Sequence, residues 1–139
     1  MAKGLSEFMD RQLIIKELLE AIPELQAVYI FGSMASGDIH VNSDLDLAIL
    51  STAAIDDVLL WDLSQQLAVQ LGHDIDLVDL LKASTVMRMQ IISTGQLLFC
   101  ADDSAISTFA DYVYSAYTRF NLERRDILHD IQQRGSIYG

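Results

Sequence analysis

The sequence predicts one α/β domain, in which a small sheet is flanked by helices, followed by a long C-terminal helix. Three observations support this fold class. Apolar runs of strand length alternate with longer segments of helical period, an order typical of α/β domains. The 139 residues fit one domain, and 51% of them are apolar, enough for a substantial core. The last segment is long, amphipathic and rich in tyrosine.

Local signals bound each element. The first helix has Ser6 as its N-cap and ends at Pro23, which cannot continue a helix. Gly72 and Gly95 end the next two helices. The predicted helices are Glu7–Ile22, Ile55–Leu71, Ser84–Thr94 and Ser104–Gln133, with a brief helical turn at Met34–Ser36. The predicted strands are Ala27–Phe31, Asp44–Leu50, Asp74–Leu80 and Gln96–Cys100.

Composition excludes several classes of protein. Nine Lys and Arg against twenty Asp and Glu give a net charge of −11, which repels nucleic-acid backbones, so we expect no direct nucleic-acid substrate. No apolar run is long enough to cross a bilayer, and the N-terminal residues lack the apolar core of a signal peptide. We therefore expect a cytoplasmic protein with no membrane partner. The single cysteine, Cys100, excludes an internal disulfide and a multi-cysteine zinc site.

Three carboxylates indicate the chemistry. Residues two apart on a strand point the same way, so Asp44 and Asp46 converge on one face. Two like charges held that close need a compensating cation, and hard oxygen ligands suit Mg²⁺ or Mn²⁺. If the third predicted strand lies beside the second, Asp76 joins them from mid-strand, whereas Asp79 points to the other face.

A turn able to hold phosphate precedes these carboxylates. Gly32 lets the backbone approach a phosphate closely, and Ser33 adds a hydroxyl donor. If Ser33 begins a short helix, its free N–H groups and the positive end of the dipole also favour an anion. Two metal ions on the carboxylates would align an attacking hydroxyl with an α-phosphate while the turn holds the β- and γ-phosphates. That is two-metal phosphoryl-transfer chemistry.

Each feature alone is ordinary, because Gly-Ser turns and strand-opening Asp-x-Asp pairs both occur without function. Their conjunction is specific. A strand is followed by Gly32-Ser33, ten further residues, the pair Asp44 and Asp46 on a second strand, and Asp76 on a third.

On these residues the chain resembles the nucleotidyltransferase superfamily that includes the DNA polymerase β type, whose signature is a Gly-Ser turn, a fixed gap and Ser-Asp-x-Asp. Within it the chain is most similar to the minimal nucleotidyltransferase (MNT) antitoxins of HEPN/MNT toxin–antitoxin modules. The resemblance covers roughly residues 5–101. The supporting segments are Phe31-Gly32-Ser33, Ser43-Asp44-Leu45-Asp46-Leu47, Asp76-Leu77-Val78-Asp79-Leu80, and Ile91-Ile92-Ser93-Thr94-Gly95 before Leu97-Leu98-Phe99.

The resemblance implies a polymerase β-like fold with a small mixed sheet and a minimal nucleotidyltransferase core over residues 1–101. We expect the C-terminal helix over residues 102–139 to dock a partner. The resemblance also implies a metal-dependent protein adenylyltransferase, the antitoxin of a type VII-like module. In that family AMP is transferred from ATP to a tyrosine hydroxyl of the HEPN ribonuclease toxin, which silences the toxin.

The same resemblance implies a role for each signature residue. Asp44 and Asp46 would bind Mg²⁺, in two ions, with Mn²⁺ as the alternative. Asp76 would complete the metal site and act as general base on the incoming hydroxyl. Gly32 and Ser33 would hold the triphosphate of ATP. One position departs from the family pattern, because many relatives have arginine where this chain has Ser36, which removes one potential contact to phosphate.

The last helix carries more aromatic residues than one stripe can bury, so some should stay exposed, as at protein interfaces. We expect Tyr114, Tyr117 and Arg124 to contact a protein partner, although interleaved acids make a solvated face equally compatible with the arginines. Trp61 and Cys100 are expected in the core. The residues expected to pack inward from the last helix are Phe109, Tyr112 or Val113, Ala116 and Phe120.

Three functions compete at this point. The leading hypothesis is a protein adenylyltransferase that acts as an antitoxin. The second is a non-catalytic antitoxin that inhibits by binding alone, and the third is a small-molecule nucleotidyltransferase of the aminoglycoside type. Three retained carboxylates favour an enzyme, since a pure binder has no need for clustered negative charge. Small-molecule enzymes usually need further protein for an acceptor pocket, and here only one helix follows the core.

Overall fold

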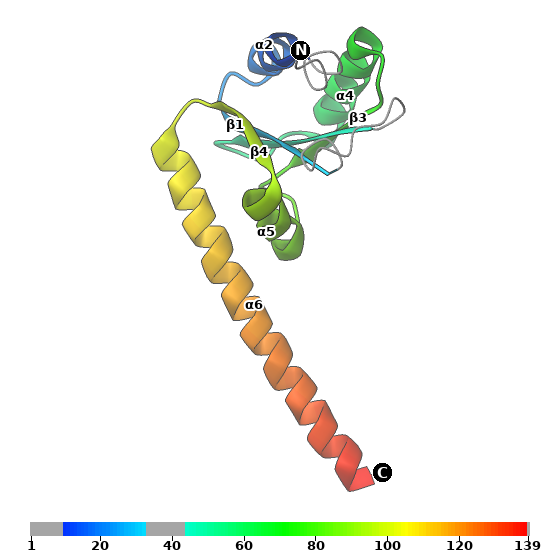
Figure 1. The fold of residues 1–139 in the computed structure, drawn as a ribbon, viewed down its shortest axis with the longest axis vertical. Helices are drawn as coiled ribbons and strands as arrows, with labels where there is room; N and C mark the ends of the chain where they lie inside the picture. The colour runs from blue at the N-terminus through cyan, green and yellow to red at the C-terminus, as the bar shows by residue number, and fades with distance from the viewer. Residues whose placement is uncertain (1–9, 33–43, 139) are drawn as a thin grey trace, which may run out of the picture.

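The computed structural model describes residues 10–32 and 44–138, with side chains described as far as residue 134. Its elements follow in the order α2 (Arg11–Ala21), β1 (Leu25–Phe31), β2 (Leu45–Ser51), α4 (Asp57–Leu71), β3 (Ile75–Asp79), α5 (Thr85–Thr94), β4 (Gln96–Cys100) and α6 (Asp103–Tyr138). The predicted alternation of strands and helices and the long last helix are confirmed (Figure 1). The predicted turn at Met34–Ser36 lies outside the described residues.

The four strands form one mixed sheet in the order β3-β2-β1-β4. Strand β1 pairs antiparallel with both β2 and β4, whereas β2 and β3 run parallel. The antiparallel pairing of β1 with β2 brings the end of β1 beside the beginning of β2. The parallel pairing brings the beginning of β3 to the same edge. Residues from three strands therefore meet at one edge of the sheet.

Helices α2 and α4 cover one face of this sheet. Alternate residues of each strand point toward them, as the period of a strand requires. The fully buried residues of this layer are Ile14 and Leu18 from α2, Leu67 from α4, Val28 and Ile30 from β1, and Leu47 and Ile49 from β2.

Helix α5 and the first turns of α6 cover the other face. The buried residues of this second layer are Ala27, Tyr29, Ala48, Leu50, Leu80 and Ile91, with Ile106 and Phe109 of α6 packed against them. Val113 is the most deeply buried side chain of α6, so it packs inward in preference to Tyr112, which is exposed. Beyond this base, α6 extends away from the sheet (Figure 1).

Helix boundaries follow the capping residues closely. The side chain of Asp10 accepts a hydrogen bond from the Leu13 N–H at 3.2 Å, so the first described helix starts at Arg11. The sequence instead predicted a start at Glu7 with Ser6 as cap, and both residues lie outside the described part. Gly72 ends α4 in the left-handed conformation with φ +75°, as predicted for a C-terminal cap.

Three expectations about single side chains need correction. Phe120 does not pack inward, because its side chain is exposed. Trp61 does not lie in the core, because its side chain is on the outer face of α4 and is 64% exposed. Leu63 and Leu67 occupy the buried stripe of that helix instead. Cys100 is only half-buried at the end of β4, and its thiol donates to Asp103 Oδ1 at 3.0 Å, which raises the pKa of the thiol.

No helix within the described residues is both long and apolar enough to span a membrane.

Candidate active site

Asp46 and Asp76 lie at the same level on neighbouring strands. The parallel register of β2 and β3 sets Asp46 beside Asp76, and both side chains point to the sheet face that α5 and α6 cover further along. Asp44 immediately precedes β2 on the same face. The expected neighbourhood of strands β2 and β3 is thus present, and it brings together the three acids that the sequence singled out.

The three carboxylates influence one another. Asp46 is half-buried, whereas Asp44 and Asp76 are exposed. Burial raises the pKa of the Asp46 carboxyl above its ordinary value, and the negative charges of Asp76 and Asp44 raise it further. A cation placed between these groups would reverse the effect of the two like charges.

Gly32 closes the site from the end of β1. Its neighbour Phe31 is paired with Asp46 across the sheet, so the turn leaves β1 directly beside that carboxylate. Gly32 has φ +74°, a conformation that side chains disfavour. A β-carbon at this position would also overlap Asp46 Oδ2. Both the backbone and the neighbouring carboxylate therefore require glycine here. Ser33 and Ser36 lie outside the described residues.

The donor set fits a hard divalent cation. Asp44, Asp46 and Asp76 offer carboxylate oxygens only, and Mg²⁺ is commonly held by one or two carboxylates while water and substrate phosphate complete its shell. Among the described residues, no group of three or more His, Cys, Asp or Glu side chains is placed so that it could hold a metal ion.

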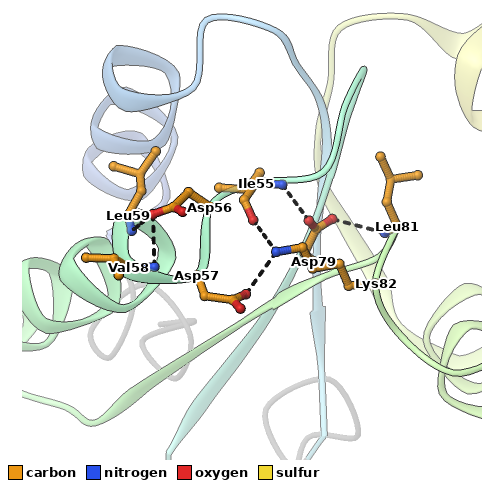
Figure 2. A network of polar contacts seen from close by, with 8 residues as sticks. All are labelled: Ile55, Asp56, Asp57, Val58, Leu59, Asp79, Leu81 and Lys82. Carbon is orange, nitrogen blue, oxygen red and sulfur yellow. Dashed lines mark hydrogen bonds and ion pairs between the residues drawn. The ribbon is translucent and has the colours of Figure 1, made fainter.

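The opposite end of β3 carries a polar network that sequence reasoning missed (Figure 2). Asp79 is 3% exposed, and its carboxylate accepts hydrogen bonds from the Ile55 N–H at 2.8 Å and the Leu81 N–H at 3.0 Å. Lys82 donates to the Ile55 carbonyl at 2.5 Å and to Asp57 Oδ1 at 2.9 Å. The hydrogen bond with Asp57 raises the pKa of Lys82. This network joins the segment before α4 to the segment after β3 and is structural.

Arg88 of α5 is a second residue that sequence reasoning missed. Its guanidinium donates to the Leu80 carbonyl at 2.7 Å and to the Leu81 carbonyl at 2.5 Å. The same group lies 5.9 Å from the ring centres of both Phe109 and Tyr112 of α6. Arg88 thus connects the end of β3 to the base of α6. No motif signals this role, since the acceptors are main-chain carbonyls.

The sheet, its helices and the acids at one edge together define a nucleotidyltransferase. The chain matches the family "Polymerase beta, Nucleotidyltransferase" over residues 14–104 and belongs to it. The resemblance and the fold that the sequence predicted are therefore confirmed.

Similarity to individual proteins indicates which kind of nucleotidyltransferase this chain resembles. The chain is 39% identical over 123 residues to the protein adenylyltransferase MntA of Shewanella oneidensis, and the alignment covers 88% of each protein. It is also 39% identical to a chain in a crystal structure of a toxin–antitoxin with AMP-PNP, with a TM-score of 0.81 and coverage of 89% of this chain and 99% of that one.

A further solved structure contains a tri-AMPylated HEPN toxin from Shewanella oneidensis in complex with its MNT antitoxin. A chain in it is 36% identical to ours with a TM-score of 0.74, and the alignment covers 88% of this chain and 95% of that one. The similarity therefore extends over nearly the whole length of these relatives.

Proposed function

We propose that this chain is an antitoxin that transfers AMP from ATP to a tyrosine hydroxyl of a HEPN ribonuclease toxin and thereby neutralises it. The observation that carries the proposal is the pairing of Asp46 with Asp76 beside Gly32, because this is the arrangement of acids and turn that nucleotidyl transfer needs. The extensive similarity to a protein adenylyltransferase supports the choice of a protein as acceptor.

Each residue would have a distinct role. Asp44 and Asp46 would hold Mg²⁺, in two ions, or Mn²⁺ in its place, and Asp76 would complete the site. When bound, the metal supplies charge neutralisation at the phosphates and orientation of the reacting oxygens. Gly32 and Ser33 would hold the β- and γ-phosphates.

The chemical step is a displacement at the α-phosphorus of ATP. Asp76 accepts the proton of the tyrosine hydroxyl, whose oxygen then forms a bond to the α-phosphorus. The bond between that phosphorus and the bridging oxygen to the β-phosphate breaks, and pyrophosphate leaves with the electron pair. The products are a tyrosyl-AMP ester on the partner and pyrophosphate. Positioning and charge neutralisation account for most of the catalysis.

The acceptor side of the site is supplied by the partner. Helix α5 and the base of α6 cover this sheet face further along, and we assign α6 to docking. The net charge of −11 disfavours RNA or DNA as acceptor. We expect the reaction to take place in the cytoplasm.

The test uses ATP labelled at either the α- or the γ-phosphate. The protein, Mg²⁺ and the HEPN protein encoded in the adjacent gene are incubated with each nucleotide. We expect label on the partner only from α-labelled ATP, and none when Asp44→Asn is combined with Asp46→Asn. Label from γ-labelled ATP would indicate a kinase. A partner whose ribonuclease activity is lost without any label would indicate inhibition by binding alone.

A further inference from the structure

Helix α6 keeps one apolar face far beyond the part that packs on the core. Ile106, Phe109 and Val113 contact the core at the base of the helix. Helical spacing places Phe120, Ile127 and Ile131 on the same side, because steps of seven and eleven residues return to nearly the same direction. We call Phe120, Arg124, Ile127, Leu128 and Ile131 the distal stripe.

The distal stripe is open to solvent. Ile127 and Ile131 are 60% and 57% exposed, whereas Val113, which lies four to five turns earlier on the same side of the helix, is buried. Phe120, Arg124, Ile127 and Leu128 line one hollow on the helix surface, together with Glu123. Contiguous exposed apolar side chains of this kind mark interaction sites.

The other side of the same helix segment is polar. It carries Arg119, Arg125, Asp126 and His129, and Leu122 is the apolar exception there at 52% exposed. Nothing in the described part of the chain covers the apolar side of this segment. Arg88 fixes its base against β3, so the stripe has a defined direction relative to the carboxylates.

We propose that the distal stripe is the surface on which the HEPN toxin docks. This inference rests on the proposed function, and it adds the face of the helix that is used and the chemistry opposite it. The solved relatives, which match this chain over nearly their full length, include an MNT antitoxin in complex with its HEPN toxin.

Charge favours the toxin over a second copy of this chain. Two copies with a net charge of −11 each repel one another. From Arg119 to Arg134, however, the helix carries four arginines against three acidic residues, and Arg124 lies within the stripe itself. The occupant should therefore present an apolar helix face with an acidic group opposite Arg124.

The test compares substitutions on the two faces of one helix. The double variant Ile127→Asp with Ile131→Asp places charges on the stripe, and Leu122→Asp places a charge on the polar side at similar exposure. Binding to the HEPN protein of the adjacent gene is measured by calorimetry without ATP. We expect the double variant to bind about 100-fold more weakly, since buried anchors dominate such interfaces, and Leu122→Asp to bind as the unaltered protein does.

Arg124→Glu provides a second variant that conserves the apolar residues, and we expect at least about tenfold weaker binding from it. Equal binding by all variants would overturn the proposal, as would an equal loss in Leu122→Asp. Loss of self-association in the double variant with unchanged toxin binding would assign the stripe to a second copy and also overturn it. Because ATP is absent, tight toxin binding that the stripe variants abolish would support docking even if no AMP were ever transferred.

Discussion

The α-carbon of Gly32 lies against the carboxylate of Asp46, so that a β-carbon on Gly32 would overlap Asp46 Oδ2. The turn and the acid occupy the same small space because the end of β1 is paired with the start of β2. A residue that would hold phosphate and a residue that would hold the metal are thus placed by a single strand pairing. A substitution at either residue should therefore displace the other.

Gly32→Ala should therefore damage the site more than the fold. The positive φ costs about 1–2 kcal/mol for a residue with a side chain. The displaced Asp46 carboxylate should lower the rate of AMP transfer by about 100-fold, as expected for misplacement of a reacting group by about 1 Å. The rate is measured with saturating ATP and partner.

Gly72→Ala is the matched control. Gly72 has nearly the same φ, +75°, but a β-carbon there would meet nothing within 4 Å. It should lose similar stability in urea unfolding and keep full transfer activity. A transfer rate in Gly32→Ala equal to that of Gly72→Ala would contradict the role given to the Gly32–Asp46 contact.

The raised pKa of Asp46 predicts a pH-dependent repulsion in the metal-free protein. A carboxyl whose pKa is higher in the folded state contributes stability below its ordinary pKa, and this contribution is lost as pH rises through the raised value. At pH 7 without divalent cations, Asp76→Asn removes the repulsion between two like charges and should therefore stabilise the protein. We expect a gain of roughly 0.2–1 kcal/mol, the range for side-chain pairs on neighbouring strands. Thermal unfolding in chelator measures this gain.

With Mg²⁺ in the same experiment, we expect the unaltered protein to be more stable than Asp76→Asn. The unaltered protein should gain melting temperature on adding Mg²⁺ at pH 7, much less so at acidic pH, and Asp76→Asn should gain little at either pH. Asp74→Asn is the control, because Asp74 is also exposed at the start of β3 but does not contribute to the raised pKa of Asp46. Identical Mg²⁺ responses in Asp76→Asn and Asp74→Asn would argue against Asp76 as a ligand.

Substitutions of two acids that lie three residues apart on β3 should have opposite effects on stability and on AMP transfer. Asp79→Ala leaves the main-chain N–H groups of Ile55 and Leu81 without their acceptor, at a cost of about 2–5 kcal/mol in the free energy of unfolding. Asp76→Ala removes an exposed side chain and should leave stability unchanged or slightly higher while transfer is lost. Urea unfolding and the transfer assay separate the two, and a destabilised Asp76→Ala with normal transfer would exchange their roles.

Arg88→Lys should loosen the base of α6. Lysine retains the charge but cannot donate to the carbonyls of both Leu80 and Leu81 while lying over the aromatic rings. We expect a loss of about 1–3 kcal/mol and faster amide hydrogen exchange over residues 103–113. Arg125→Lys, on the exposed side of α6, should change neither. Unchanged exchange in Arg88→Lys would show that apolar packing alone holds the helix.

Much of the fold could be predicted from the sequence because strand and helix periods differ and the caps are explicit. The face of Asp76 relative to Asp79 followed from alternation alone. The placement of β1 between β2 and β4 did not, since strand order depends on pairings between distant segments. The prediction that Trp61 lies in the core was wrong for a related reason. The apolar run around it allows two helical phases, and only packing against the sheet selects the one that buries Leu63 and Leu67.

The acidic residues of the site could be predicted from the sequence, but the residues that hold the surrounding elements in place could not. Two carboxylates spaced two residues apart on a strand can be recognised in the sequence. Arg88, in contrast, donates to main-chain carbonyls, which have no sequence signature. The buried role of Asp79 could have been found, because it shares the strand face of Ile75 and Leu77, and an acid on a buried face needs donors. The roles of Asp44, Asp46, Asp76, Gly32 and Ser33 in transfer remain predictions.

The central claim is tested most directly by the intact mass of the HEPN partner after incubation with ATP, Mg²⁺ and this protein. We predict a gain of one or more AMP units, located on tyrosine by fragmentation, and no gain with the variant that combines Asp44→Asn and Asp46→Asn. An unchanged partner mass together with full inhibition of its ribonuclease activity would contradict the claim, and so would an equal gain with the variant.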